Sequence, residues 1–521
     1  MKMLALTLLF GSLAAGAQAP STDISGTWVA HYTTPNGESE VSYVLKVDHG
    51  NLSGTQTLPF GEAPIVSGHI DGDQFDFTVE LDAFGGLQKR DGHGKIVGDT
   101  LEITLAMPQR PAPSPGSDAP PSPQPQTVIA HRGTPTPNYR APRVDYTTLP
   151  KIDLPAIQPL PSNGLAKTPP MGWNSWNKFR TKIDDKTVRE IADAMVSSGM
   201  RNAGYLYINI DDGWQGKRDA QGVLQPNPDF PNMKALADYV HSKGLKLGIY
   251  SSPGPRTCAG YEGSYGHEEI DAKTWSAWGM DYLKYDWCSA ARVWKDTDMQ
   301  PVYQRMGEAL HGTGRPIVYA LCQYGRDNVQ QWGPAVAANL WRTTGDIRDQ
   351  WQSMTKIGFA QGVVAPFAKP GNWNDPDMLE VGNGGMTTEE YRVHFSLWAI
   401  LAAPLIAGND LRSMTPEIHD ILTNKEVIAV DQDALGKEGT GIAQDGDVEV
   451  YAKQLENGDY AVAFFNRGEQ QATTTLRWSN LQMSGKHAVR DLWKHANRGK
   501  VADQFSADVP PHGVVMIRVS K

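Results

Sequence analysis

The chain has 521 residues, enough for three or four domains of ordinary size, or for one large barrel with smaller neighbours. Its composition, 40 % hydrophobic and 20 % charged, is ordinary for a soluble globular protein. The net charge of -10 argues against nucleic acid or an anionic membrane as the main partner.

Residues 1–19 have the pattern of a secretory signal peptide. Lys2 precedes the apolar run from Met3 to Ala15, and small residues follow. We expect cleavage after Ala17, because a cut after Ala19 would leave proline at the new terminus. No later run reaches the roughly 18 apolar residues of a membrane span. The sequence therefore predicts a secreted or periplasmic protein that is not inserted in a membrane.

Two further regions precede residue 166. Residues 20–106 alternate apolar and polar side chains, as in 41–47 and 75–81, with turn signals between them, and predict a small all-β domain. Residues 107–165 are rich in proline and predict an extended linker. The simplest role for the β domain is a spacer or surface-docking module, and sugar binding is the alternative.

From residue 166 to about 430 a pattern of strand, polar tip and helix repeats. The predicted strands are residues 171–176, 205–210, 246–250, 282–286, 316–321, 340–343, 363–367 and 398–406. Helical spacing separates them, as in Met233, Leu236, Ala237 and Val240. Eight such units favour a (β/α)8 barrel over a doubly wound open sheet. Residues 431–521 contain a hairpin pattern around Asn457-Gly458 and predict an antiparallel β domain.

The segment 281–288 holds two charges in a strand that otherwise looks buried. Lys284 and Asp286 are two residues apart and therefore share a face of the strand. An unpaired buried charge costs several kcal/mol, roughly, so a buried ion pair is the simplest explanation for one such strand. Other predicted strands, however, also end in polar and aromatic residues, at 173–176, 211–214, 250, 322–325, 342–346 and 374–378.

These strand ends converge on one rim of a barrel, where such folds place their active sites. Carboxylates accept hydrogen bonds from sugar hydroxyls, while aromatic rings pack on the C–H faces of a sugar. Glycoside hydrolysis needs two carboxyl groups flanking one bond. The sequence therefore favours glycoside chemistry at this rim.

Six motifs between Lys167 and the C-terminus, in order, resemble glycoside hydrolase family 27, which comprises α-galactosidases and α-N-acetylgalactosaminidases. They are MGWNSWN, INIDDGW, RTCAGYEGSYG, LKYDWC, WRTTGDI and NWNDPDML. The resemblance implies a (β/α)8 barrel followed by an antiparallel β-sandwich domain. It also implies an exo-acting α-galactosidase that retains anomeric configuration.

By this resemblance Asp286 is the nucleophile and Asp346 the general acid/base. Lys284 on the same face would keep Asp286 ionised at neutral pH. Asp346 needs a raised pKa to protonate the leaving oxygen. Arg342 would lower that pKa if it were close, so we expect Arg342 to grip a sugar hydroxyl instead.

The resemblance also supplies the substrate-binding residues. Asp211 and Asp212 correspond to the pair that holds O4 and O6 of galactose. The remaining pocket residues are Trp173, Tyr250, Cys258, Lys284, Cys322, Gln323, Asp377 and Met378. Cys322-Gln323-Tyr324-Gly325 stands where many members have Cys-Glu-Trp. Gln323 offers hydrogen bonds but no charge to the sugar's 2-position, and its long side chain fits poorly with a 2-N-acetyl group.

The three cysteines allow one disulfide and one thiol. Cys258 and Cys288 follow neighbouring predicted strands, which could bring them within bonding range, and the resemblance also pairs them. Cys322 would then remain a thiol facing the pocket. Zinc-ligand spacing, an HExxH pair and a Walker-type loop are all missing from the sequence, so we expect neither metal nor cofactor.

Four other functions remain open. An α-N-acetylgalactosaminidase and a β-L-arabinopyranosidase are the alternatives of the same class. A non-catalytic carbohydrate-binding protein is the alternative of a different class, and the presence of both Asp286 and Asp346 counts against it. A structural or adhesive role for the whole chain is weaker still.

Overall fold

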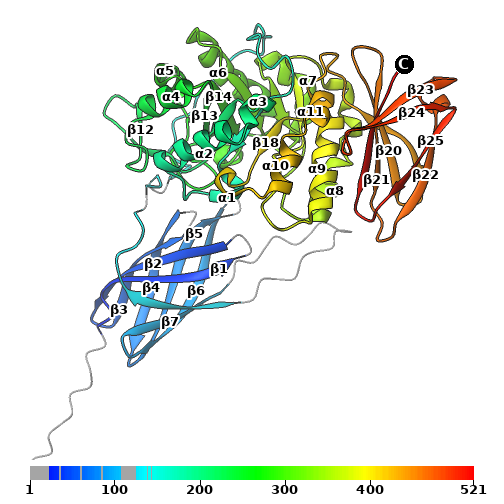
Figure 1. Cartoon of the computed structure of the whole chain (residues 1–521). Coiled ribbons are helices and arrows are strands. Elements are labelled where there is room, and N and C mark those ends of the chain that lie inside the picture. The colour runs from blue at the N-terminus through cyan, green and yellow to red at the C-terminus, as the bar shows by residue number, and fades with distance from the viewer. Residues whose placement is uncertain are drawn as a thin grey trace, which may run out of the picture. The chain divides into compact units, whose positions relative to one another are not determined.

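Figure 1 shows a computed structural model of the chain. It describes residues 23–34, 37–58, 61–83, 86–106, 125–137, 139–141 and 144–521, so the predicted signal peptide lies outside the described residues. The chain divides into two compact units, residues 1–137 and 138–521. Each unit has a hydrophobic core of its own.

Unit 1 is a closed barrel in which each strand pairs with the next and β8 pairs with β1. The strands are β1 Gly26–Thr34, β2 Gly37–Asp48, β3 Asn51–Leu58, β4 Gly61–Asp71, β5 Gln74–Ala83, β6 Gly86–Val97, β7 Thr100–Leu105 and β8 Gln126–Arg132. Aromatic side chains fill its interior so closely that a Cβ on Gly94 would meet the Phe75 ring at 2.0 Å.

The eighth strand corrects the predicted boundary at residue 106. Strand β8 lies inside the range predicted as linker, and it completes the barrel by pairing with both β7 and β1. Val128 and Ala130 of β8 face the core and alternate with exposed residues. This alternation is short and follows a proline-rich stretch, so it was not identified as a strand from the sequence. The all-β character of the domain is confirmed.

Unit 2 is built around an eight-stranded parallel sheet in the order β17-β16-β15-β14-β13-β10-β9-β18. Its strands are β9 Met171–Asn174, β10 Tyr207–Asn209, β13 Lys246–Ser251, β14 Tyr282–Asp286, β15 Val318–Cys322, β16 Leu340–Arg342, β17 Trp373–Asp375 and β18 Leu405–Ala407. Leu379, just after β17, pairs in parallel with Ala407 of β18 and so joins the two edges. The predicted (β/α)8 barrel is confirmed.

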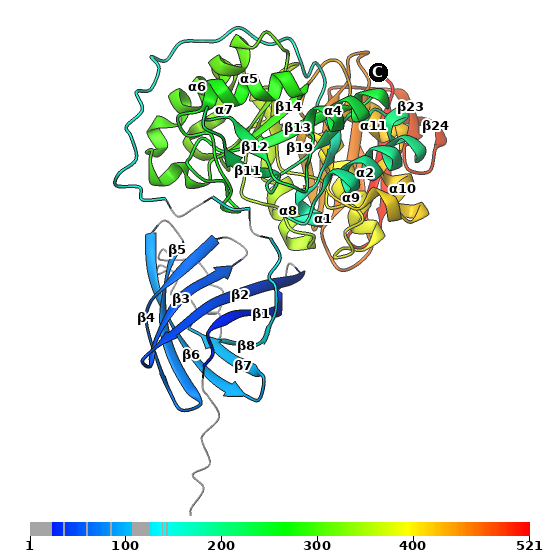
Figure 2. The same cartoon turned by 90° about the vertical axis from the view of Figure 1, so that its left-hand side faces the viewer.

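Helices alternate with these strands, and Figure 2 shows α4 and α5 close to β13 and β14. The helices are α1 Trp176–Phe179, α2 Asp185–Ser197, α3 Met200–Ala203, α4 Met233–Ser242, α5 Glu268–Trp278, α6 Met299–Gly312, α7 Val329–Trp332, α8 Trp351–Gly358, α9 Thr388–Ile400, α10 Pro416–Leu422 and α11 Lys425–Asp431. On α4 the residues at helical spacing, Met233, Leu236, Ala237 and Val240, are the buried ones, as predicted. A short hairpin of β11 Gln215–Arg218 and β12 Leu224–Pro226 follows β10.

Two predicted strands are wrong in position. Residues 363–367 lie in two 3-10 turns, Gln361–Val363 and Ala365–Phe367, because Pro366 lacks the N–H that a ladder needs; the seventh strand is β17. Residues 398–400 end helix α9, and the eighth strand begins only at Leu405. A continuous apolar run does not show where a buried helix ends and a strand begins.

The C-terminal part of unit 2 is antiparallel, as predicted. It has a six-stranded sheet in the order β19-β20-β21-β26-β23-β24 and a second sheet of β22 and β25. The strands are β19 Thr440–Asp445, β20 Val448–Gln454, β21 Tyr460–Asn466, β22 Ala472–Arg477, β23 Lys486–Asp491, β24 Ala496–Ala502, β25 Gln504–Val509 and β26 Val514–Val519. The hairpin predicted around Asn457-Gly458 is the pair β20 and β21.

Residues 144–165 form neither helix nor strand, yet they are held by the barrel. The Tyr265 hydroxyl donates to Pro150 O at 2.8 Å, Gln304 Nε2 to Ala156 O at 2.8 Å, and Leu160 N to Ala335 O at 2.8 Å. Figure 2 shows this extended segment as a cyan trace along the outside of unit 2.

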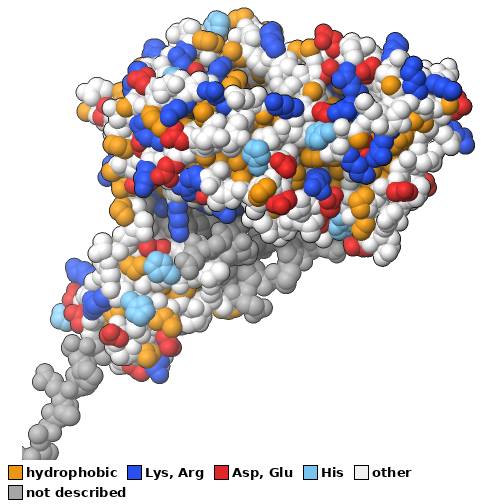
Figure 3. Space-filling model, in the orientation of Figure 1, with side chains coloured by type: hydrophobic (Ala, Val, Ile, Leu, Met, Phe, Trp, Pro, Cys, Tyr) orange, Lys and Arg blue, Asp and Glu red, His pale blue; other side chains and the backbone are white. Residues whose placement is uncertain are grey.

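Figure 3 shows basic and acidic side chains interspersed on the face of the molecule in view. Within the described ranges, every helix is too short or too polar to cross a bilayer.

Candidate active site

The register of the parallel sheet brings the predicted residues to one rim. Tyr250 of β13 pairs with Lys284 of β14, and Asp286 of β14 pairs with Cys322 of β15. On the next pair of strands Arg342 of β16 pairs with Asp375 of β17. Since parallel strands end at the same edge of the barrel, these polar side chains gather at its C-terminal mouth.

Asp286 is buried, with 5 % of its surface exposed, and both of its carboxylate oxygens are held by phenols. The Tyr250 hydroxyl donates to Oδ2 at 3.1 Å, and the Tyr324 hydroxyl donates to Oδ1 at 2.5 Å. Burial raises the pKa of Asp286 to about 6, while the Lys284 charge and the Tyr324 hydrogen bond oppose that rise. The carboxyl is therefore ionised at neutral pH, as a nucleophile requires.

Lys284 forms its ion pair with Asp211, not with Asp286. Its Nζ lies 2.9 Å from Asp211 Oδ2, which also accepts from Asn174 Nδ2 at 2.9 Å. Asp211 Oδ1 accepts from the backbone N–H of Asp212 at 2.8 Å. Both oxygens of Asp211 are thus engaged in holding the rim together, and its predicted contact with galactose stays a prediction.

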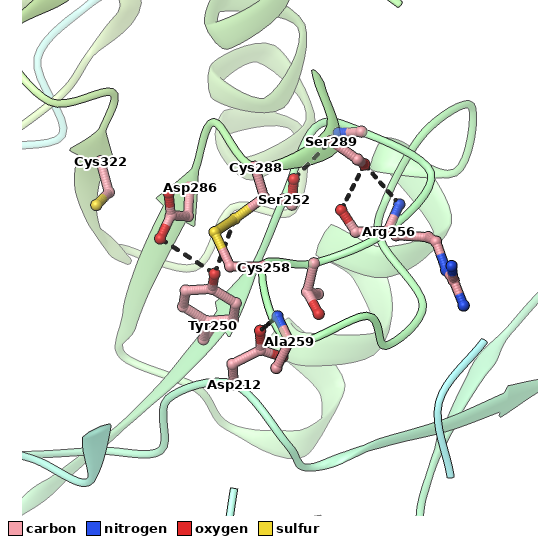
Figure 4. The surroundings of a disulfide bond; sticks show 12 residues. Asp212, Tyr250, Ser252, Arg256, Cys258, Ala259, Asp286, Cys288, Ser289 and Cys322 are labelled. Carbon is pink, nitrogen blue, oxygen red and sulfur yellow. Dashed lines mark hydrogen bonds between the residues drawn. A yellow bond between two sulfur atoms is a disulfide. The ribbon is translucent and has the colours of Figure 1, made fainter. Parts of the chain in front are cut away.

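Asp212 offers an oxygen that the protein leaves unused. Its Oδ2 accepts from the N–H of Ala259 at 2.7 Å, whereas Oδ1 is buried and lacks a hydrogen-bond partner among the described residues. Figure 4 shows Asp212 facing the backbone of Ala259, beside Cys258. Burial raises the pKa of Asp212 to about 7. A buried acceptor of this kind is suited to a ligand hydroxyl.

Arg342 lies between two carboxylates. Its Nη2 is 2.9 Å from Asp377 Oδ2 and 3.2 Å from Asp346 Oδ1. The Asp346 side chain is 70 % exposed, whereas that of Asp377 is buried. Burial tends to raise the pKa of Asp346, but Arg342 and then Lys284 outweigh it, and the net pKa lies below the usual value. The free enzyme therefore differs from the expectation of a raised pKa at Asp346.

Asp377 holds the loop that carries Asp346. Its Oδ2 accepts from the N–H of Ile347 at 2.8 Å, and its Oδ1 accepts from the N–H of Met378 at 2.8 Å. Its own N–H donates to Asp375 Oδ1 at 2.9 Å. The φ of Asp377 is +95°, a conformation that costs of order 1–3 kcal/mol and is found mainly at functional sites.

The predicted disulfide between Cys258 and Cys288 is present, with a Cα–Cα distance of 4.8 Å. Figure 4 shows Tyr250 between this disulfide and Asp286, and the Tyr250 hydroxyl lies 3.3 Å from Cys288 Sγ. Cys322 is a buried free thiol, 3.6 Å from Arg342 Nη1. Among the described residues, Cys258, Cys288 and Asp286 form the group whose potential ligand atoms lie close enough together to hold a metal ion. Both cysteines are in the disulfide, so neither offers a thiolate ligand.

Three further predicted pocket residues lie at the same rim. Trp173 is fully buried in β9 and its indole N–H donates to Asn409 O at 2.7 Å. Gln323 is fully buried, and its Oε1 and Nε2 both lack a partner within the described ranges. Met378 is half-buried beside Asp377. Their contacts with a sugar stay predictions.

Sequence reasoning missed Tyr324 and Asp375. Tyr324 was noted from the sequence only as part of a motif that departs from the family pattern. Its hydroxyl, which can donate a hydrogen bond, was the signal that could have revealed its contact with Asp286. Asp375 stood inside a quoted motif without a role; burial raises its pKa to about 6.

Comparisons with known proteins agree with this geometry. Residues 168–433 match the family model described as α-galactosidase A, and residues 445–519 match the α-galactosidase C-terminal β-sandwich domain. An α-galactosidase of Cyamopsis tetragonoloba is 50 % identical over 363 residues, which cover 68 % of this chain and 87 % of that protein. α-Galactosidase 2 of Arabidopsis thaliana is 50 % identical over 368 residues, covering 70 % of this chain and 92 % of that protein.

A solved structure extends the agreement to three dimensions. The crystal structure of α-galactosidase I from Mortierella vinacea superposes with a TM-score of 0.66 at 39 % sequence identity, covering 69 % of this chain and 98 % of that chain. The family models, the relatives and the solved structure therefore all identify the barrel, which carries the candidate active site, as that of an α-galactosidase. The chain belongs to the α-galactosidase family, glycoside hydrolase family 27, and is an α-galactosidase glycoside hydrolase.

Proposed function

We propose that the enzyme releases terminal α-D-galactosyl residues from oligosaccharides, polysaccharides or glycoconjugates by double displacement. Asp286 is the nucleophile and Asp346 the general acid/base. The observation that carries this assignment is the Asp286 carboxylate, which is buried, ionised at neutral pH and held at both oxygens by phenols. Binding alone does not require a buried carboxylate fixed in this way.

In the first displacement an oxygen of Asp286 forms a bond to the anomeric carbon. The bond to the leaving oxygen breaks as Asp346 transfers its proton to that oxygen. In the second displacement a water attacks the anomeric carbon, Asp346 takes the proton of that water, and the carboxylate of Asp286 departs. Two inversions at one carbon give net retention.

The contact between Arg342 and Asp346 must weaken before Asp346 can act as an acid. Because the Asp346 side chain is 70 % exposed in the free enzyme, a bound leaving group would cover it and raise its pKa by desolvation. Arg342 keeps a partner throughout, since Asp377 lies 2.9 Å away and is buried. Substrate binding thus provides the raised pKa that the free enzyme lacks.

Asp212 is the residue we assign to recognition of galactose. Its unpartnered Oδ1 would accept from the O4 or O6 hydroxyl. A site built around such an acceptor discriminates strongly against an analogue that lacks the hydroxyl. A panel of aryl glycosides distinguishes the alternatives. A preference for the 2-N-acetyl substrate would indicate an α-N-acetylgalactosaminidase, and a preference for the arabinopyranoside would indicate a β-L-arabinopyranosidase.

Proton NMR of the first-formed sugar tests the mechanism. Retention gives α-galactose first from an α-galactoside, and β-galactose first would show that water attacks directly. Asp286→Ala should abolish turnover, and azide should restore part of it with inverted product. Asp346→Ala should lose less activity on substrates with good leaving groups. A trapped complex should place the two carboxyl groups about 5–5.5 Å apart rather than about 6.5–9.5 Å.

We also propose that the chain is exported, with its signal peptide cleaved after Ala17. The pattern of Lys2 followed by an apolar run supports export, and so does a disulfide, which persists in oxidising compartments. N-terminal sequencing of the protein from its native host tests this. A mature chain that begins at Met1 would exclude it.

A further inference from the structure

Tyr324 holds the oxygen of Asp286 that Tyr250 leaves free. The two phenols come from either side of β14. Tyr250 lies in β13, and Tyr324 stands two residues after Cys322, the last residue of β15, which pairs with Asp286. The Tyr324 bond to Oδ1 is 2.5 Å long, and the Tyr250 bond to Oδ2 is 3.1 Å long. A short hydrogen bond to a carboxylate is a strong one.

The backbone at Tyr324 is arranged for this contact. Its φ is +63°, in the left-handed region that bulky residues rarely adopt. The next residue must be glycine, because a Cβ on Gly325 would lie 2.0 Å from Thr343 O. The phenol is also surrounded, with Cys258 Sγ 3.6 Å from its oxygen and the Arg342 guanidinium 5.8 Å from its ring. An unfavourable conformation that aims a side chain at a reacting carboxylate indicates a functional constraint.

We propose that Tyr324 is a catalytic residue whose hydroxyl stabilises the Asp286 carboxylate as it departs from the galactosyl ester. This role rests on Asp286 being the nucleophile. Tyr324 donates more strongly to a carboxylate anion than to an ester, so its hydrogen bond strengthens as the ester bond breaks. In the first displacement the same bond is already made in the free enzyme and weakens on attack. Tyr324 therefore assists the second displacement most.

Other groups act on the same carboxylate and must be held constant in any test. They are Tyr250 on β13, Lys284 on β14, Cys322 on β15, Asp211 and Asp212 after β10, and Asp346 after β16. Substitution of Tyr324 alone leaves all of them in place. Because Tyr324 favours the charged form of Asp286, its removal should also move the titration of Asp286 to higher pH.

The test compares Tyr324→Phe and Tyr324→Leu with the parent enzyme on an aryl α-galactoside that has a good leaving group. Phenylalanine keeps the ring, and leucine keeps an apolar side chain. Neither variant has a side-chain hydrogen-bond donor, so both should lower kcat by roughly 10- to 100-fold. KM should fall with kcat as the galactosyl-enzyme accumulates, and rapid mixing should reveal a burst of about one equivalent of aryl alcohol.

A second measurement isolates the titration of Asp286. In an Asp346→Ala background the activated aryl substrate needs no acid for the first displacement, so the pH dependence of kcat/KM, which reports the free enzyme, follows Asp286 together with the binding groups. Adding Tyr324→Phe should shift this profile to higher pH. Tyr239→Phe is the matched control. Tyr239 lies on α4, away from the rim, and its hydroxyl donates to the Asp193 carboxylate at 2.7 Å, so the substitution also removes a phenol that binds a carboxylate. It should change neither the burst nor the profile.

Equal losses in kcat and kcat/KM, with no burst and an unmoved pH profile, would show that Tyr324 only shapes the pocket. A Tyr324→Leu enzyme with parental kcat and profile would show the same, and it serves if the phenylalanine variant fails to fold. Failure of Asp286 as nucleophile is a separate result, since it would appear as β-galactose formed first by the parent enzyme.

Discussion

Galactose binding should release a proton from Asp212. The carboxyl is buried, its Oδ2 accepts from Ala259, and its Oδ1 is left for a ligand. Burial raises its pKa to about 7, so at pH 6 the free enzyme holds Asp212 mostly protonated. Sugar hydroxyls donate best to the ionised form, and their hydrogen bonds therefore lower the pKa on binding.

The size of the effect follows from the pKa. At pH 6, about one unit below that value, Asp212 carries about 0.9 of a proton, and at pH 8 about 0.1. If the complex is fully ionised, galactose should release roughly 0.9 proton at pH 6 and roughly 0.1 at pH 8. The association constant should then fall by up to about tenfold for each pH unit below 7. Calorimetric titration in two buffers of different ionisation enthalpy measures the released protons directly.

Asp212→Asn is the matched control, because it keeps the shape of the side chain and removes its titration. Asp286, with a pKa of about 6, also exchanges protons near this pH, but it is present in both proteins. The difference between parent and variant therefore isolates Asp212. If the parent releases no more protons than Asp212→Asn, the sugar binds a neutral Asp212 or does not contact it, and the recognition model is wrong.

Three further outcomes are expected. Comparison of kcat/KM should show α-galactosides cleaved far better than β-L-arabinopyranosides or 2-N-acetyl analogues, and a preference for either analogue would promote that alternative. Peptide mapping without reduction should find Cys258 linked to Cys288, and Cys322 should react with a thiol reagent only after unfolding, because it is buried. Glu438→Gln should stabilise the protein by about 3 kcal/mol more at pH 7 than at pH 4.5, since burial raises the pKa of Glu438 to about 8. A raised pKa of Glu438 favours the folded state at low pH, and this contribution to stability is lost as pH rises from about 4.5 to 8. Denaturant unfolding at pH 4.5 and pH 7 measures the stability that the substitution gains. Equal gains at the two pH values would contradict the prediction.

The barrel and its rim were predictable because two independent signals coincide. Strand and helix periods alternate along unit 2, and the chemically unusual residues stand where the strands end, as Lys284 and Asp286 do on β14. Parallel pairing then fixes which side chains become neighbours, so that Asp286 lies opposite Cys322. The positions of β17 and β18 were missed because the apolar residues at 363–367 are typical of a strand but form 3-10 turns, and because the apolar run 398–406 includes both the end of helix α9 and the start of β18.

Side-chain partners were the part that the sequence left open. The Lys284 charge lowers the pKa of Asp286, as expected, but the ion pair of Lys284 is with Asp211. Arg342 was expected to stay away from Asp346, yet it bridges Asp346 and Asp377. Neither choice follows from strand order, because each depends on the path of a loop beyond the strand end. Only the loop geometry decides which of several nearby carboxylates a cation meets.

The proline-rich segment before the barrel shows the same limit more clearly. Its composition predicts that it cannot form a core, and in residues 144–165 it indeed forms no helix or strand. Composition is silent, however, on whether another surface binds its backbone. Just before these residues, Arg140 Nε donates to Ala259 O at 2.8 Å, while the N–H of Ala259 donates to Asp212 at 2.7 Å. A residue outside the matched range 168–433 thus contacts the peptide that holds Asp212, the carboxylate that we assign to galactose recognition, so the segment supports the candidate active site.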